Sequence, residues 1–197
     1  MVLPAYIDES TGEITDGEAW VGLGTTTLGS DTATITFTST DDGQVGDFSQ
    51  YMDLMVVWYA RSAKAATGEG YLGMRYNNNS GAIYGQQYLT GDGSSASAAE
   101  SAGPTYTFLG FIPNNNVTAN IFASGVCSIF DINSGKYKSS IAQLAEDMDG
   151  SGRVRLEAVA WRNQAPISEI DIFEVYGENM LAGSQVSLFG ILPRMVA

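Results

Sequence analysis

The feature that most constrains this chain is the spacing of its apolar runs, which are short and are separated by Gly, Asn, Asp or Pro. Most of these runs alternate or are rich in β-branched and aromatic residues, a pattern that predicts strands. Residues 32–38 place Ile35 and Phe37 on one face and threonines on the other, as in a half-buried strand. Residues 52–60 are apolar on both faces, which predicts a central strand. Roughly nine or ten such segments at regular spacing indicate a sandwich or jelly roll.

Further strands are expected at residues 70–76, 82–89, 105–112, 117–132 (one bent strand or two), 154–161, 167–176 and 186–192. The first two read as a pair joined by an Asn-rich turn, because Asn and Gly adopt positive φ at little cost. Residues 90–103 are rich in Gly, Ser and Ala and are predicted to form a surface loop. In the strand at residues 154–161 the apolar side chains Val154, Leu156, Ala158 and Ala160 all face one way.

One segment departs from the strand pattern. Residues 139–148 fit a short helix, with Ile141, Leu144 and Ala145 on one face, as well as they fit a strand followed by a turn. We therefore predict an all-β, jelly-roll-like antiparallel sandwich with room for one short helix. The sandwich is expected to span residues 30–197, preceded by an N-terminal arm or irregular segment at residues 1–29.

The charge balance restricts the partners of this chain. Lys and Arg total 9 and Asp and Glu total 22, so the formal net charge is −13. A domain this acidic is repelled by phosphate backbones and by anionic lipid, so neither nucleic acid nor a membrane is an expected partner. The first residues show no basic stretch followed by a long apolar core, and we expect synthesis in a cytoplasm without a secretory signal.

The residue types also limit the available chemistry. The chain has no histidine and a single cysteine, Cys127. Histidine-based nucleophilic sites, histidine-ligated zinc, thiolate zinc cages and iron–sulfur clusters all require residues that are missing. Cys127 lies in an apolar run and is predicted to be a small buried hydrophobe. We expect no catalytic residues and no enzyme activity.

Carboxylate chemistry needs a separate argument, because a glycoside hydrolase requires only two Asp or Glu side chains. No pattern selects a pair among the candidates Asp41, Asp42, Glu69, Glu157 and Glu169. We expect these carboxylates to be solvated.

The sharpest local motif is D-M-D-G-S-G at residues 147–152. It matches the first half of a calcium loop, with candidate metal ligands Asp147, Asp149 and Ser151. The twelfth position is Ala158 instead of the bidentate glutamate that such loops use. The motif therefore predicts a Gly/Asp turn that leads into the next strand, with bound calcium as the alternative. No other cofactor is expected.

The tryptophans divide into two kinds. Trp58 and Trp161 lie in apolar strands and are predicted to pack in the core, whereas Trp20 is the candidate exposed or interface aromatic. Exposed aromatic rings can stack on sugars, so a carbohydrate-binding module is one possible class.

Several motifs occur in a recognisable order. The run T-I-T-F-T at residues 34–38 precedes Y-M-D-L-M-V at 51–56, R-S at 61–62, L-G-M-R-Y-N at 72–77, W-R-N at 161–163, I-S-E-I-D-I at 167–172 and G-S-Q-V-S-L-F-G-I at 183–191. This ordered set resembles a group of virion proteins of tailed bacteriophages, especially those of marine bacteria and cyanobacteria. Their pattern closes with G-S-x-x-S-L-Y-G-I, where this chain has Phe189 in place of tyrosine. The similarity covers roughly residues 30–192.

The resemblance implies a jelly-roll structural protein of the virion, with no catalytic residues to transfer. We expect a capsid decoration or cement protein, a homotrimer that joins neighbouring subunits of the major capsid protein. A tail or tail-fibre component, acting as an adaptor or receptor-binding module, remains an alternative. Less favoured are a carbohydrate-binding module that uses Trp20 or tyrosines and, last, a carboxylate glycosidase.

Overall fold

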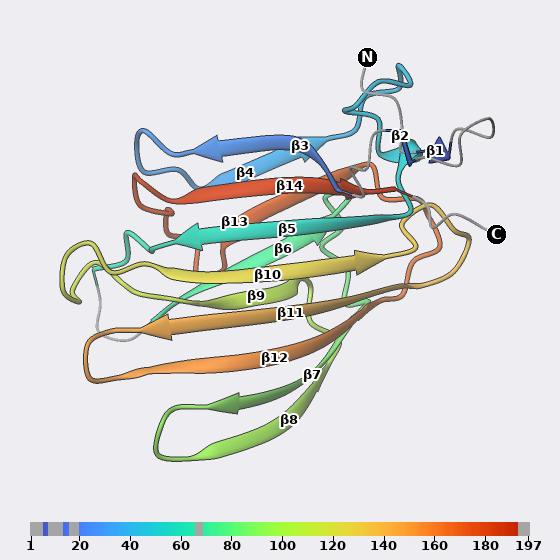
Figure 1. The fold of residues 1–197 in the computed structure, drawn as a ribbon. Coiled ribbons are helices and arrows are strands. Elements are labelled where there is room, and N and C mark those ends of the chain that lie inside the picture. The colour runs from blue at the N-terminus through green and yellow to red at the C-terminus, as the bar shows by residue number, and fades with distance from the viewer. Residues whose placement is uncertain (1–5, 8–13, 16–19, 66–68, 193–197) are drawn as a thin grey trace.

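The protein is built almost entirely from antiparallel strands. The computed structural model describes residues 6–7, 14–15, 20–65 and 69–192. Within these ranges there is no α-helix, and one 3₁₀ turn, η1, spans Phe48–Gln50. Residues 139–147, which fitted a helix or a strand, belong to a strand (Figure 1). The predicted all-β sandwich is confirmed.

Two sheets form the sandwich. The larger has eight strands in the order β3, β14, β5, β10, β11, β12, β7 and β8, and the smaller has four in the order β4, β13, β6 and β9. The larger sheet comprises β3 (Trp20–Thr27), β14 (Gln185–Ile191), β5 (Asp53–Ala60), β10 (Ala123–Phe130), β11 (Lys138–Asp147), β12 (Gly152–Trp161), β7 (Tyr84–Gly91) and β8 (Ala96–Ala102). The smaller comprises β4 (Thr34–Thr38), β13 (Glu169–Glu174), β6 (Gly70–Tyr76) and β9 (Thr107–Ile112). A separate two-stranded sheet pairs β1 (Tyr6–Ile7) with β2 (Ile14–Thr15).

The strand order is that of a jelly roll with two insertions. When the β7–β8 and β11–β12 hairpins are set aside, eight strands remain, and they pair first with last: β3 with β14, β4 with β13, β5 with β10 and β6 with β9. This nested pairing is the rolled double Greek key of a jelly roll. The two inserted hairpins lie side by side beyond β10 and lengthen the larger sheet (Figure 1). We call these four strands, β11, β12, β7 and β8, the extension.

The core lies between the sheets and is centred on Trp58. This side chain is 1% exposed, as is Trp161, so both tryptophans pack in the core as predicted. A Cβ atom on Gly125, in the neighbouring strand, would lie 2.5 Å from the indole. A Cβ on Gly110, in β9 of the opposite sheet, would lie 2.6 Å from it. The indole therefore fits only because both neighbours lack a side chain.

Three local predictions are wrong. The segments at residues 70–76 and 82–89 do not pair, because β6 and β7 belong to different sheets and the turn at Asn77 and Asn78 leads from one sheet to the other. Residues 90–103 are not a loop, since they contain β8. Residues 20–27, expected within the arm at residues 1–29, form β3, so the sandwich begins at Trp20. In each case pairing with a neighbouring strand outweighs weak local preference.

Gly125→Ala should destabilise the fold by about 1–3 kcal/mol, because the added methyl group would overlap the indole of Trp58. The matched control is Gly22→Ala in β3, where a Cβ has no neighbour within 4 Å. Alanine suits a strand better than glycine does, so the control should be neutral or stabilising. Urea unfolding followed by tryptophan fluorescence measures both, and equal stabilities would contradict the expectation.

Candidate functional site

The first half of β12, in the extension, shows an inverted polarity. In β12 the apolar side chains Val154 and Leu156 face solvent and are 62% and 46% exposed. The alternate positions carry Arg153, Arg155 and Glu157, which turn toward the smaller sheet, and Glu157 is fully buried. In a strand with one solvated face, apolar side chains normally point toward the core and charged ones toward water. The exposed apolar surface of the extension therefore calls for a functional explanation.

We call the solvent-facing surface of the eight-stranded sheet the outer face. Its large exposed hydrophobic side chains come from five strands: Trp20, Val57, Tyr59, Leu89, Ile141, Val154 and Leu156. Among the exposed, outward-facing residues of the described strands of this sheet, only Glu100 and Asp147 are charged. The outer face is thus nearly uncharged and rich in exposed apolar side chains, with Thr, Ser and Gln between them, in a chain whose net charge is −13.

Aromatic pairs add to the outer face. The ring of Tyr59 stacks on that of Phe122, with centroids 4.8 Å apart. Trp20 lies 6.3 Å from Phe189 and is 51% exposed, which confirms the prediction that it is the exposed tryptophan. Half-exposed aromatic rings are typical anchors of protein interfaces.

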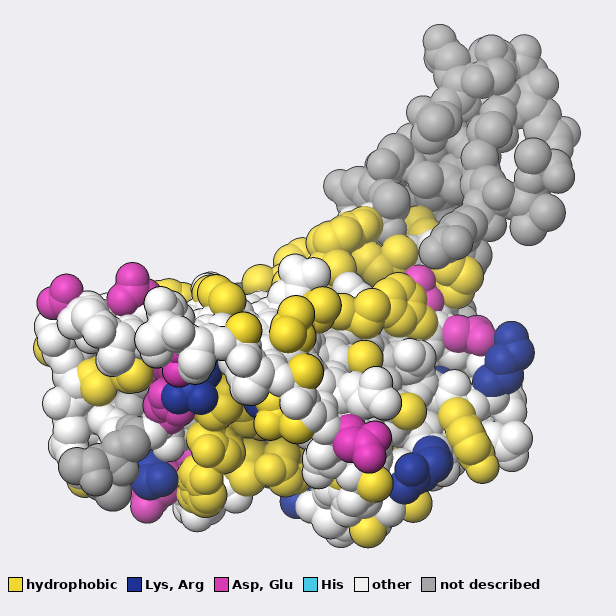
Figure 2. Space-filling model, turned by 90° about the horizontal axis from the view of Figure 1, so that it is seen from below, with side chains coloured by type: hydrophobic (Ala, Val, Ile, Leu, Met, Phe, Trp, Pro, Cys, Tyr) yellow, Lys and Arg dark blue, Asp and Glu magenta, His cyan; other side chains and the backbone are white. Residues whose placement is uncertain are grey.

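The charged side chains of the extension are accommodated where it overhangs the edge of the smaller sheet. The guanidinium of Arg155 lies 3.5 Å from the ring centre of Tyr88 and 4.5 Å from that of Phe108. Its Nε donates to Glu157 at 2.6 Å. Seen from below, basic and acidic side chains lie beside a patch of hydrophobic ones (Figure 2). Arg155 thus balances the charge of Glu157 while its stem and plane pack on aromatic rings.

The expectation of solvated carboxylates is wrong for Glu157, which is buried and paired with Arg155. Burial raises the pKa of Glu157, although the bond from Arg155 opposes this effect. The alternation predicted for residues 154–161 put Val154 and Leu156 on one face, which leaves Arg155 and Glu157 on the other. It gave no sign that this face is the inner one. Asp41 and Asp42 are exposed and Glu169 is half-buried.

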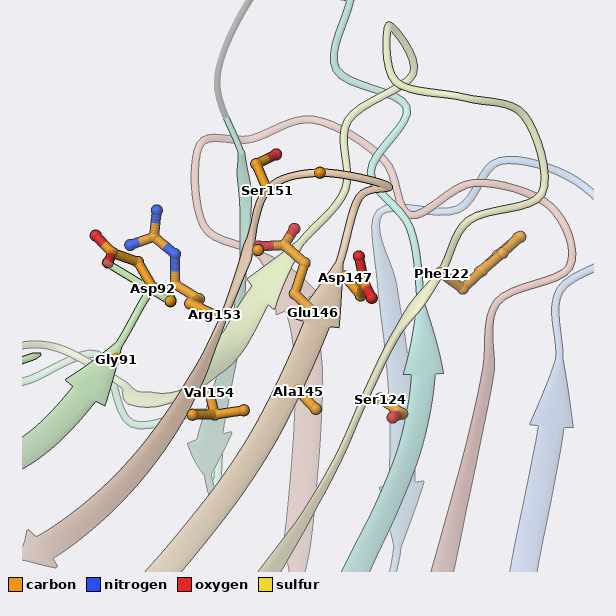
Figure 3. A pocket seen from close by; sticks show the side chains of 13 residues that line it. Gly91, Asp92, Phe122, Ser124, Ala145, Glu146, Asp147, Ser151, Arg153 and Val154 are labelled. Carbon is orange, nitrogen blue, oxygen red and sulfur yellow. The ribbon is translucent and has the colours of Figure 1, made fainter. Parts of the chain in front are cut away.

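Glu146, which no sequence pattern singled out, is an unpaired carboxyl group in this region. It is 4% exposed, and both of its oxygens lack a hydrogen-bond partner among the described residues. Arg153, its cross-strand neighbour, instead donates to Glu69 at 2.5 Å. Glu146 and Arg153 extend from adjacent strands beneath the turn that joins them (Figure 3). Burial, and then the charge of Glu69, raise the pKa of Glu146 to about 7, with Arg153 opposing them.

The candidate metal ligands Asp147, Asp149 and Ser151 lie in or beside the β11–β12 turn. One carboxylate oxygen of Asp147 accepts from the backbone N–H of Asp149 at 3.0 Å. The N–H of Met148 donates to the carbonyl of Ser151 at 2.7 Å, which closes the turn. Asp149 has a φ of 62°, a left-handed conformation that Asp tolerates. The motif therefore forms a Gly/Asp turn that leads into β12, and calcium binding there stays a prediction.

A cavity of about 740 Å³ lies beside this turn, between it and the β7–β8 turn. Its lining includes Asp92, Phe122, Glu146, Asp147 and Arg153 (Figure 3). Within the described part of the chain, no three His, Cys, Asp or Glu side chains are grouped so that they could hold a metal ion. Cys127 is fully buried, as predicted, and burial raises the pKa of its thiol to about 12.

Comparisons with known proteins add little to this description. No family model matches the chain, and neither does any curated protein. One solved structure, titled "Crystal structure of HCR/D-Sa-GBL1/C", matches with 8% sequence identity and a TM-score of 0.24. The match covers 94% of this chain but 47% of that one, so this chain spans about half of that protein's length. No helix in the described ranges is long and apolar enough to cross a membrane.

Glu146→Gln should stabilise the protein clearly more at about pH 8 than at about pH 5. The pKa of Glu146 is raised above that of the unfolded chain, so the native state keeps a proton that the unfolded state loses. This contribution to the free energy of unfolding is present at low pH and is lost as pH rises toward 7. The amide stays neutral throughout.

Thermal unfolding at both pH values measures the effect. Glu178→Gln, which removes the same charge from an exposed position after β13, is the control and should have little effect on stability. Equal stabilisation by Glu146→Gln at both pH values would contradict the raised pKa of Glu146 in the native state.

Proposed function

We propose that this chain is a virion structural protein of a tailed phage, most specifically a capsid decoration protein that docks on the shell through its outer face. The observation that carries the proposal is the apolar, nearly uncharged outer face of an otherwise acidic domain. The outer face supports a role in binding another protein. The resemblance described above supports a phage particle as the place where this binding occurs.

The size of the outer face suits a stable protein contact. Eight strands about 4.8 Å apart, each about seven residues long, give a surface of roughly 800–900 Å². A standard protein interface buries about 800 Å² on each partner. Large exposed apolar side chains that gather on one face of a protein mark an interaction site.

The distribution of charge favours the same surface. A net charge of −13 repels other acidic surfaces and keeps the free subunit soluble. A partner that approaches the outer face meets only Glu100 and Asp147 as exposed charges of the sheet. Desolvation of this surface is therefore cheap, because few charges lose their water.

Leu156→Glu should reduce the number of copies per particle at least tenfold, because it places an unpaired charge in the middle of the contact. Leu156 is 46% exposed, so the fold should tolerate the change. The control is Thr34→Glu, which adds the same charge to an exposed position of β4 in the smaller sheet. Phage is propagated with each variant, and washed particles are quantified by mass spectrometry.

The location is tested by labelling this chain in intact particles. Signal over the head, together with selective loss of Leu156→Glu, supports the proposal. Signal confined to the tail would replace the decoration role with that of a tail or fibre component. Normal incorporation of Leu156→Glu would show that the outer face is not the docking surface.

A further inference from the structure

The four edges of the two sheets are not equally protected against pairing with another strand. β9, an edge of the smaller sheet, is buried along its whole length under the larger sheet. β4 has only five residues, and the pairing of β3 with β14 is interrupted by a bulge. Short strands and bulges are both devices that prevent unwanted pairing.

β8 has none of these devices. It is the outermost strand of the extension (Figure 1), and it pairs with β7 over seven consecutive residues without a bulge. All seven of its residues are exposed. It contains no Pro, no Lys and a single charge, Glu100. Its free edge therefore presents a row of backbone donors and acceptors that another strand can reach.

The sequence of β8, A-S-A-A-E-S-A, is nearly the same in both directions. If two copies are laid antiparallel and centred on Ala99, Ser97 faces Ser101 of the other copy and Ala96 faces Ala102. Glu100 then faces Ala98, so no like charges are opposed. A shift of two residues that is centred on Glu100 would place the two carboxylates opposite each other, which is unfavourable. A shift of one residue would turn the faces of the two sheets to opposite sides.

We propose that β8 pairs with β8 of a second copy of this chain, antiparallel and centred on Ala99. Small side chains on both faces let the two backbones approach without steric obstruction. The contact has two-fold symmetry, since each copy contributes the same residues. It joins the two eight-stranded sheets edge to edge and continues the outer face from one copy into the other.

Substitutions at Ala98, which faces Glu100 of the other copy, test the register. Ala98→Glu should weaken the dimer roughly tenfold, because two pairs of like charges are then opposed. Ala98→Lys, at the same exposed position, should strengthen it by a similar factor. Sedimentation velocity over a range of concentrations of the full chain measures the dissociation constant, and circular dichroism confirms that both variants fold.

Cross-linking gives a second readout of the same contact. Ala99→Cys places two thiols directly across the two-fold axis, so mild oxidation should give a covalent dimer. Ser101→Cys, on the same face of the strand, places the thiols four residues apart, roughly 13 Å, and should not cross-link. Cys127 is fully buried and is present in both variants.

A wild-type chain that remains monomeric at all concentrations would overturn the proposal, as would equal effects of Ala98→Glu and Ala98→Lys. A trimer in solution would also overturn the proposal, because the two-fold contact between β8 strands joins only two copies. The outcome is separate from that for the outer face, because Leu156→Glu lies in β12 and should leave the β8 dimer intact.

Discussion

The indole of Trp58 determines how the two sheets can lie on each other. It extends from β5 and touches the positions of Gly125 beside it and Gly110 across the core. Its close fit holds β9 against β10 and β11 of the larger sheet. β9 is also the edge strand at which the smaller sheet ends. Beyond that edge the first half of β12 lacks a complete apolar partner, whereas Trp161 at its other end stays buried in the core. The inverted polarity in the first half of β12 follows, because no described strand of the smaller sheet lies beyond β9 to cover the inner face there with apolar side chains.

The motifs on which the proposed resemblance to phage virion proteins rests lie largely in the jelly-roll strands and their connections, and they serve the fold. Ser184, at the start of the closing motif, is buried and accepts from the backbone N–H of Arg61 at 3.1 Å. The side-chain oxygen of Asn77 accepts from the backbone N–H groups of Ser168 and Glu169. The outer face of the extension, Glu146 and β8 belong instead to the inserted hairpins. These motifs therefore belong to a scaffold, while the surfaces proposed to bind partners lie mostly on the insertions.

Periodicity predicted most of the strands and their faces, but it could not tell which face is buried. Val154 and Leu156 share a face, as predicted, yet that face is the exposed one because no second sheet covers it. Arg155, which pairs with the buried Glu157, packs on aromatic rings from β7 and β9, which are distant in the sequence. β8 was missed because Ala and Ser carry little strand preference, and it forms because β7 offers a free edge. The exposed face of β12, the packing around Glu157 and the formation of β8 all depend on contacts between strands that are distant in the sequence. A local sequence pattern does not contain this information.

The inverted polarity has a cost and a benefit that can be weighed. Placing charged groups between the sheets leaves Glu146 buried without a partner among the described residues, because its cross-strand neighbour Arg153 is paired with Glu69. A stable monomer would gain by exchanging these positions, with Val154 and Leu156 inside and the charges in water. The opposite arrangement is reasonable only if the outer face is not in water in the functional state. Contact with a partner would then bury the apolar side chains that the free subunit exposes. Assembly would in that case contribute part of the stability of the folded chain.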